Sequence, residues 1–239
     1  MVGFEPQPDA LATLNARKSD LETYLPYVIG DGSPGKLKVT RLTGMTSLLR
    51  PDPHIAKYFR IFGAWGEVVK EAPTGTKRLD DIAEIAHLDF LKIDVQGSEL
   101  SIFKHGARRL GDAVAVQTEI SFMPLYKRQP LFGEVDQELR RLGFVPHAFA
   151  GITRAMIAPL AGDNPYAALN QLLEADIVYV RDFTQPDRMQ SEQLKHLAII
   201  AHHCYRSFDL AACCIEKLAE RGAIAKDAVQ RYVSLLPRR

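Results

Sequence analysis

Two short apolar segments separated by one amphipathic stretch constrain the fold of this chain more than any other feature. Residues 88–94 and 113–120 are apolar enough to be strands buried on both faces, as in parallel sheets. Between them, residues 98–110 place apolar side chains at helical spacing. A strand, a helix and a second strand in this order form a right-handed crossover, so we expect two parallel strands of one sheet.

The rest of residues 1–186 alternates short apolar runs with helix-period segments, which is typical of an α/β domain. Further strands are predicted at 2–5, 24–29, 36–43, 144–149 and 175–181, and helices at 8–18, 78–86 and 132–142. Prolines and glycines between residues 44 and 80 predict loops and short pieces there.

Residues 187–239 hold no strand pattern, so we expect a C-terminal helical extension. Two or three amphipathic helices, broken near residues 206–208 and 222, cover residues 190–236. We expect their apolar stripes to pack on the domain formed by residues 1–186. The alternative is a homodimer built through these helices.

Composition excludes several classes of function. The 239 residues include 30 Lys and Arg against 29 Asp and Glu, and a net charge of +1 argues against a dedicated binder of nucleic acid or of a membrane surface. The three cysteines, Cys204, Cys213 and Cys214, form no disulfide framework and suit a reducing compartment. No apolar run approaches the roughly 18 residues of a membrane helix. We therefore expect a soluble, cytoplasmic protein.

Residues 30–35 match the G-x-G-x-x-G pattern of dinucleotide-binding loops, but the match is rejected. Such a loop must lead directly into a helix whose free N–H groups hold the phosphates. Residues 36–40 alternate like a strand instead, so we expect a turn, and a nicotinamide oxidoreductase is disfavoured. The His-His-Cys run at 202–204 and the cysteines at 213–214 lack the spacing of a zinc site, so no metal ligands are predicted.

Four acidic residues lie where predicted strands end: Glu5, Asp31, Asp94 and Glu119. Open α/β sheets bind ligands at this edge. If the two crossover strands are neighbours, their axes are about 4.8 Å apart, and the carboxylates of Asp94 and Glu119 share one rim. Such a pair can hold a cation, take a proton from a hydroxyl, or form salt bridges. Glu5 could accept both hydroxyls of a ribose and Asp31 an adenine amino group, although both residues are also common in turns.

Five segments together resemble the FkbM-family methyltransferases. They are VGFEPQP at 2–8, GMTSL at 44–48, DFLKIDVQGSE at 89–99, AVQTEISF at 115–122 and PLY at 124–126. The resemblance spans residues 1–183 in order. It implies a Rossmann-like class I methyltransferase sheet, mostly parallel, in residues 1–186. It also implies S-adenosylmethionine as the cofactor for methylation of an oxygen atom, often a sugar hydroxyl.

Carried over position by position, the resemblance implies that Glu5 binds the cofactor ribose and that Asp31 lies near the adenine. Asp94 matches the acid beside the methyl-transfer centre, at the end of the family's fourth strand, and Glu119 matches the acid after the fifth. Gln96 replaces an acid in the family's Asp-x-Glu-Gly turn, which removes one charge.

Two segments, 44–53 and 122–132, are predicted to shape the pocket for a small-molecule or glycan acceptor. Within them we assign acceptor contacts to Ser47, Tyr126 and Lys127. The family's first strand and glycine loop, upstream of the match to 2–8, have no counterpart here. We expect the chain as given to be N-terminally incomplete and to bind the cofactor weakly or not at all.

The sequence therefore predicts an S-adenosylmethionine-dependent O-methyltransferase that acts on a hydroxyl of a sugar, glycan or natural product. Asp94 or Glu119 is expected to serve as the base or to orient the hydroxyl. The alternative, prompted by the missing glycine loop, is a non-catalytic relic or interaction protein derived from a methyltransferase.

Overall fold

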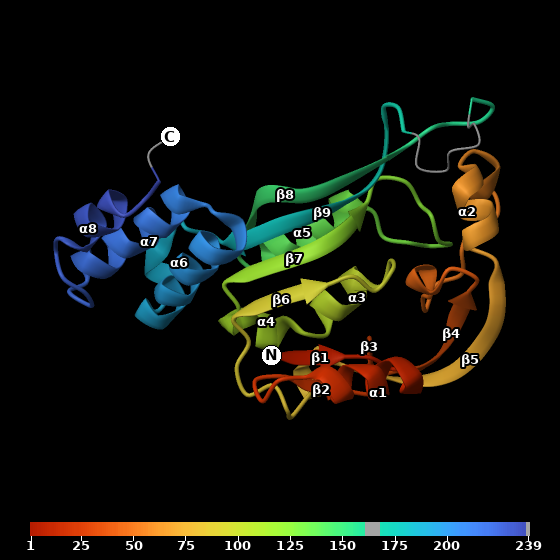
Figure 1. The fold of residues 1–239 in the computed structure, drawn as a ribbon, viewed down its shortest axis with the longest axis horizontal. Coiled ribbons are helices and arrows are strands. Elements are labelled where there is room, and N and C mark those ends of the chain that lie inside the picture. The colour runs from red at the N-terminus through yellow and green to blue at the C-terminus, as the bar shows by residue number, and fades with distance from the viewer. Residues whose placement is uncertain (161–167, 238–239) are drawn as a thin grey trace.

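The predicted crossover forms one side of a four-stranded sheet. In the computed structural model, which describes residues 1–160 and 168–237, β6 (Phe90–Ile93) and β7 (Ala115–Ser121) pair in parallel. The sheet continues through β9 (Gln171–Arg181) to β8 (Phe144–Ala155), and both of these pairings are antiparallel. The parallel pair predicted from residues 88–94 and 113–120 is thus confirmed (Figure 1).

The crossover helix is interrupted where the sequence pattern predicts continuity. Residues 98–110 contain two helices, α3 (Glu99–Lys104) and α4 (Ala107–Asp112), with Gly106 between them. A Cβ atom at Gly106 would lie 2.8 Å from the Leu79 side chain and 2.9 Å from the Ile102 carbonyl oxygen. The close approach of Leu79 therefore requires glycine at this position, and the helix breaks around it. The predicted helix at 78–86 shrinks to a 3-10 turn, Leu79–Asp81.

Two smaller sheets contain the remaining strands. β1 (Val2–Phe4) pairs in parallel with β2 (Thr23–Leu25), and the third sheet has the order β3 (Val28–Ile29), β5 (Val68–Lys77), β4 (Pro34–Thr40). The predicted strand at 24–29 is split because Pro26, between β2 and β3, has no N–H to donate.

Strand β5 is missing from the sequence prediction. It contains Pro73, which pairs with Lys36 of β4 in the antiparallel ladder. On its other side β5 meets β3 only at Thr76 and Lys77, so Pro73 is at an open edge, where a residue without an N–H is tolerated. β4 itself confirms the predicted half-exposed antiparallel strand and the rejection of a nucleotide-binding loop at residues 30–35.

The prediction of a mostly parallel sheet is confirmed only in part for the described residues. The β1–β2 sheet is parallel, whereas the other two sheets are mixed, and their longest pairings, β8 with β9, β7 with β9 and β4 with β5, are antiparallel. In the four-stranded sheet β6, β7 and β8 run in the same direction, and β9, which lies between β7 and β8, runs opposite to them. Within the described part of the chain, β1 pairs only with β2 and β6 only with β7, so each has an edge without a strand partner.

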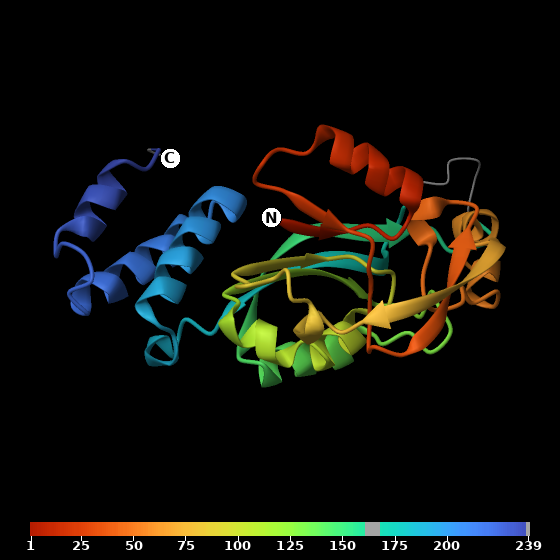
Figure 2. The same ribbon diagram turned by 90° about the horizontal axis from the view of Figure 1, so that it is seen from below.

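The main core lies between the four-stranded sheet and its helices. Figure 2 shows α3, α4 and α5 (Phe132–Arg141) along one face of this sheet, with α1 (Pro8–Arg17) on the opposite side of the molecule. Phe103, Leu110 and Leu139 are fully buried there. Val2 and Phe4 of β1 pack against the same core. A separate short helix, α2 (Arg60–Trp65), lies beside β5.

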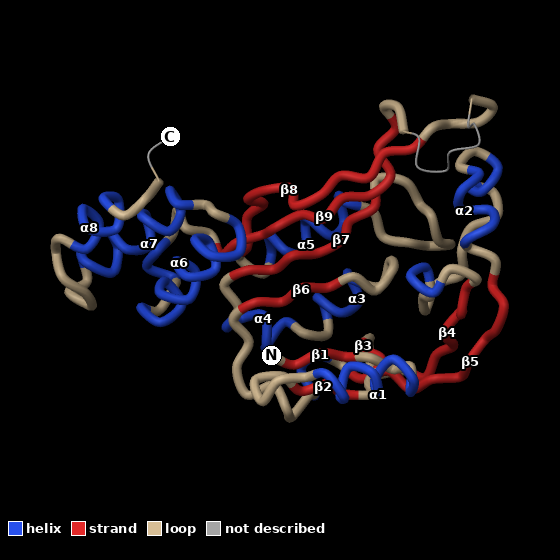
Figure 3. Tube along the Cα trace, viewed as in Figure 1, coloured by secondary structure: helices blue, strands red, loops and turns tan. Residues whose placement is uncertain are grey.

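The C-terminal tail is helical, as predicted. It consists of α6 (Ser191–Tyr205), α7 (Phe208–Glu220) and α8 (Ala228–Ser234), which Figure 3 shows gathered at one end of the molecule. Leu197 and Cys214 pack against Val114 and Val178 of the sheet region, which confirms packing on the same chain. A dimer and the domain boundary at 186/187 stay predictions. No described helix is long and apolar enough to cross a bilayer.

Arg181 joins the start of β7 to the helices beside it. Its Nε donates to the Ala113 carbonyl (3.0 Å), Nη1 to the Leu142 carbonyl (2.7 Å) and Nη2 to the Leu110 carbonyl (2.5 Å). The guanidinium also lies 4.1 Å from the centre of the Phe144 ring. One planar group thus satisfies the carbonyls at the ends of α4 and α5.

Arg181→Lys should lower the free energy of unfolding by about 2 kcal/mol, because an ammonium cannot reach all these carbonyls and leaves some unpaired. Urea denaturation monitored by circular dichroism measures this change. The exposed Arg188→Lys is the control and should change stability by less than about 0.5 kcal/mol. Equal effects in the two variants would contradict the structural role of Arg181.

Candidate active site

Asp94 and Glu119 meet at one rim of the four-stranded sheet. Asp94 follows β6 directly and Glu119 lies near the end of β7, so the parallel pairing places both at the same edge. The Gln96 amide joins them, with Nε2 donating to Asp94 Oδ1 (2.7 Å) and to Glu119 Oε2 (2.9 Å). The predicted proximity of the two acids is confirmed, whereas their catalytic role stays a prediction.

The turn that carries Gln96 is held in an unfavourable backbone conformation. Gln96 has φ 57° and Gly97 has φ 97°, and a non-glycine residue in the left-handed region costs about 1–2 kcal/mol. Ser47 Oγ donates to the Gln96 carbonyl (2.7 Å), and the Tyr126 hydroxyl donates to Gln96 Oε1 (2.8 Å). Contacts from two distant segments therefore fix the amide between the two carboxylates.

Two of the three residues predicted to bind the acceptor make these contacts. Ser47 and Tyr126 are fully buried, and their hydroxyls hold the Gln96 turn. Lys127 is exposed, and its backbone N–H donates to the Arg50 carbonyl (2.8 Å). Acceptor binding by these residues stays a prediction, but in this structure Ser47 and Tyr126 position the turn.

Three further acids surround the pair, and sequence reasoning assigned none of them. Glu99 is buried, and its Oε1 accepts the N–H groups of Val95 (3.0 Å) and Gly97 (3.2 Å). On β9, Asp176 is directly opposite Glu119, and Glu174 follows on the same face. The alternation Glu-Ala-Asp at 174–176 was the available signal, because residues two apart in a strand point to the same side.

The acids of this rim oppose one another's ionisation. Burial, together with the charges of Glu174 and Asp94, raises the pKa of Glu119 well above its ordinary value. Burial and the charge of Asp94 also raise the pKa of Glu174, whose Oε1 is buried without a hydrogen-bond partner. Asp94, Glu119 and Glu174 take part in none of the ion pairs between described residues. The rim therefore suits a positively charged ligand.

A hard metal cation is one species that the rim could hold. One carboxylate oxygen from each of Asp94, Glu99 and Glu119 lies within 4.8 Å of the others. Carboxylate oxygens are the ligands that Mg²⁺ and Ca²⁺ prefer. Glu99 already accepts two backbone N–H groups, however, which leaves Asp94 and Glu119 as the freer donors.

The two predicted cofactor residues lie at the ends of other strands. Glu5 follows β1, which points in the same direction as β6 and β7 in Figure 1, and its Oε1 accepts the Gln7 N–H (2.8 Å). Asp31 follows β3, and its Oδ1 accepts the Ser33 N–H (2.8 Å), which lowers the pKa of Asp31. Asp31 thus stabilises the turn into β4. Contacts of Glu5 and Asp31 with a cofactor stay predictions.

Comparison with known protein families identifies the family of this chain. Residues 1–146 match the methyltransferase FkbM domain. The chain belongs to the FkbM methyltransferase family. Membership makes the protein a methyltransferase and implies S-adenosylmethionine as its methyl donor, as the sequence resemblance predicted. Searches of curated proteins and of solved structures give no match.

The residues of the rim fit this methyl donor in two respects. S-adenosylmethionine carries a positive sulfonium, and a positive charge beside Asp94, Glu119 and Glu174 would relieve the repulsion that raises the pKa values of Glu119 and Glu174. Its ribose presents two hydroxyls, for which the carboxylate of Glu5 at the end of β1 is a suitable acceptor. Both features lie at the ends of strands that run in the same direction (Figure 1).

Glu119→Gln should stabilise the protein increasingly as pH rises above about 4.5, the ordinary pKa of the group. In the unfolded chain Glu119 ionises freely above this pH, whereas the folded protein holds it protonated, so the wild type loses stability with rising pH. An amide does not ionise and avoids this loss. Urea denaturation at several pH values between 4.5 and 8 measures the difference between the two proteins.

Glu192→Gln serves as a control of opposite sign. Hydrogen bonding to Lys195 lowers the pKa of Glu192, so its ionised form stabilises the folded state above the ordinary pKa. Replacing Glu192 should therefore destabilise the protein slightly at higher pH. A pH-independent effect of Glu119→Gln would contradict the electrostatic description of the rim.

Proposed function

We propose that the protein transfers the methyl group of S-adenosylmethionine to a hydroxyl oxygen of a sugar, a glycan or a natural product. The observation that carries this proposal is the pair Asp94 and Glu119, held on one amide at the rim of the sheet. The family supports methyl transfer, and the pair supplies the groups that an oxygen acceptor requires.

A hydroxyl acceptor must lose its proton as the oxygen–carbon bond forms. Asp94 is exposed and accepts one hydrogen bond from Gln96, so an acceptor hydroxyl can reach its remaining oxygen. Glu119 is less exposed, and its raised pKa makes its ionised form a stronger base than an ordinary carboxylate. We assign the uptake of the hydroxyl proton to Asp94 and the orientation of the hydroxyl to Glu119, whose carboxyl can donate or accept a hydrogen bond there.

The donor supplies a carbon that is already activated by its sulfonium, so the protein mainly aligns the two reactants. Glu5 would hold the ribose hydroxyls, and the negative rim would attract the sulfonium. The Gln96 turn keeps the two catalytic carboxylates at fixed separation, because Ser47 and Tyr126 hold both its backbone and its side chain. Lys127, exposed on the adjoining segment, is available to bind a polar acceptor.

Asp94→Asn and Glu119→Gln should each reduce methyl transfer by about 10²–10⁴-fold, which is the usual contribution of a positioned acid or base. Turnover is measured as S-adenosylhomocysteine released in the presence of sugar or glycan acceptors. Glu216→Gln, an exposed change on α7, should retain wild-type turnover. Wild-type turnover in both rim variants would remove the catalytic assignment.

Calorimetry with S-adenosylmethionine distinguishes an enzyme from a non-catalytic relic. Tight binding by the wild type would argue against the relic, and Asp94→Asn should then bind equally well, because this change removes the base but leaves Glu5 intact. The edges of β1 and β6 that have no strand partner among residues 1–160 and 168–237 are the observation that favours the relic. A wild-type chain that is folded but binds no cofactor and transfers no methyl group would support the relic.

A further inference from the structure

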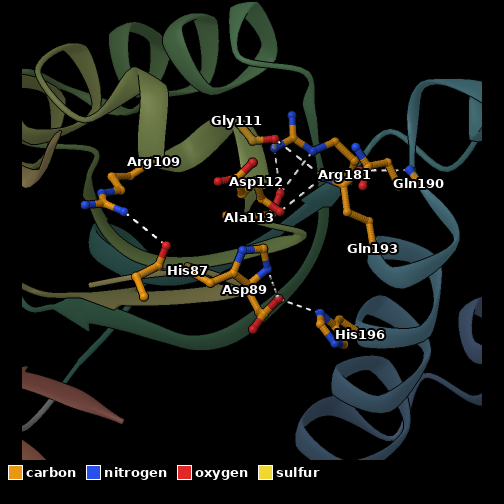
Figure 4. Close-up of polar contacts among 11 residues, drawn as sticks. His87, Asp89, Arg109, Gly111, Asp112, Ala113, Arg181, Gln190, Gln193 and His196 are labelled. Atoms are coloured by element: carbon orange, nitrogen blue, oxygen red, sulfur yellow. Dashed lines mark hydrogen bonds and ion pairs between the residues drawn. The ribbon is translucent and has the colours of Figure 1, made fainter. Parts of the chain in front are cut away.

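Two histidines and an aspartate from distant parts of the chain converge at the opposite end of β6. His87 Nε2 lies 2.9 Å from Asp89 Oδ1, and His196 Nδ1 lies 2.5 Å from the same oxygen. Figure 4 shows both imidazoles directed at this carboxylate, His87 from the segment before β6 and His196 from α6. The rim acids that follow β6 are five residues further along, about 16 Å away in extended chain.

The local structure brings the three side chains close together. His87 and Asp89 lie two residues apart in the segment just before β6, and their side chains are in hydrogen-bond contact. Leu88 between them points into the core. His196 neighbours Leu197, which is fully buried against the sheet region and so fixes the position of α6.

The backbone that carries this cluster is well anchored. The Asp89 carbonyl accepts the N–H groups of Val114 (2.8 Å) and Ala115 (3.3 Å). Arg109 donates to the carbonyls of Ala86 (3.3 Å) and Ile82 (2.9 Å), just before His87. His87 and Asp89 therefore belong to a segment that is anchored to the sheet region, and His196 belongs to a helix that is packed against it.

The geometry of the cluster suits a metal ion. One ligand atom from each residue lies within 4.8 Å of the other two. A tetrahedral Zn²⁺ with bonds of about 2.0–2.1 Å needs ligand atoms about 3.3 Å apart, which small side-chain rotations achieve here. Two imidazole nitrogens and one carboxylate oxygen are ligands that Zn²⁺ accepts, and a water molecule can take a fourth position because the three side chains are 35–52% exposed.

We propose that His87, Asp89 and His196 form a binding site for a divalent transition-metal ion, with Zn²⁺ the preferred one. Bound there, the ion takes the place of the protons that otherwise bridge the two imidazoles to Asp89. It links the helical tail to the start of β6. This site is separate from the methyltransferase rim and serves to fasten α6 onto the sheet.

A pocket adjoins the site on the side of His87. It has a volume of about 660 Å³ and is lined by residues that include His87 before β6, Asp112 before β7, Arg181 at the end of β9 and Gln193 on α6. The pocket gives water and ions a route to His87. The second imidazole, on His196, is reached from the exposed side of α6.

Titration of metal-free wild-type protein with Zn²⁺ by calorimetry tests the proposal. We expect one ion per chain, and at least about tenfold weaker binding in both His87→Gln and His196→Gln, since loss of even an outer-shell partner of a metal costs that much. Zn²⁺ should also raise the melting temperature of the wild type, and raise that of the two variants less at the same Zn²⁺ concentration. Circular dichroism verifies that each variant is folded.

His203→Gln is the matched control, because His203 lies on the same helix, is exposed and neighbours the exposed Cys204. It should bind Zn²⁺ like the wild type. With Co²⁺ as a probe, visible bands without a thiolate charge-transfer band would exclude ligation by cysteine and support the site. The proposal is overturned by absence of binding, by wild-type binding in both His87→Gln and His196→Gln, or by loss of binding in His203→Gln.

Discussion

The parallel pairing of β6 with β7 is the interaction on which the candidate active site depends. It spans only four residue pairs, from Phe90 opposite Ala115 to Ile93 opposite Thr118. Its register places Asp94 one residue beyond the ladder and beside Glu119, close enough for one amide to bond both. A shift of one residue would turn Glu119 to the other face of the sheet and separate the acids.

The resulting cluster of acids is costly to the folded protein. Glu119 is directly opposite Asp176, and like charges in opposite positions of an antiparallel pair destabilise a sheet. Burial adds to the cost, as the raised pKa values of Glu119 and Glu174 show. An arrangement of this kind is typical of functional sites, where a ligand or a reaction uses the unfavourable charge. The family of this chain supplies such a ligand in a cationic methyl donor.

The sequence predicted those parts of the fold that rest on local pattern. The β6–β7 crossover, β4 and the three tail helices follow from apolar periodicity, and all were confirmed. The break at Gly106 could not be predicted, because it results from the approach of Leu79 from a distant segment. The antiparallel return of β9 beside β7 depends likewise on contacts across the chain.

The same limit applies to the sites. Asp94 and Glu119 were predictable because both end strands of one crossover, whereas Glu174 and Asp176 join them only through the register of β9. His196 lies 107 residues from Asp89 in the sequence, and no ligand spacing connects the two. Such sites emerge only when distant segments pack together.

The most direct test of this account is the titration of the Glu119 side-chain carboxyl, followed by NMR and assigned by comparison with Glu119→Gln. The account predicts that this carboxyl stays protonated well above pH 4.5 in the ligand-free protein. It also predicts that S-adenosylmethionine shifts the titration to lower pH, because a nearby positive charge favours the carboxylate. A midpoint near pH 4.5 that the cofactor leaves unchanged would contradict it.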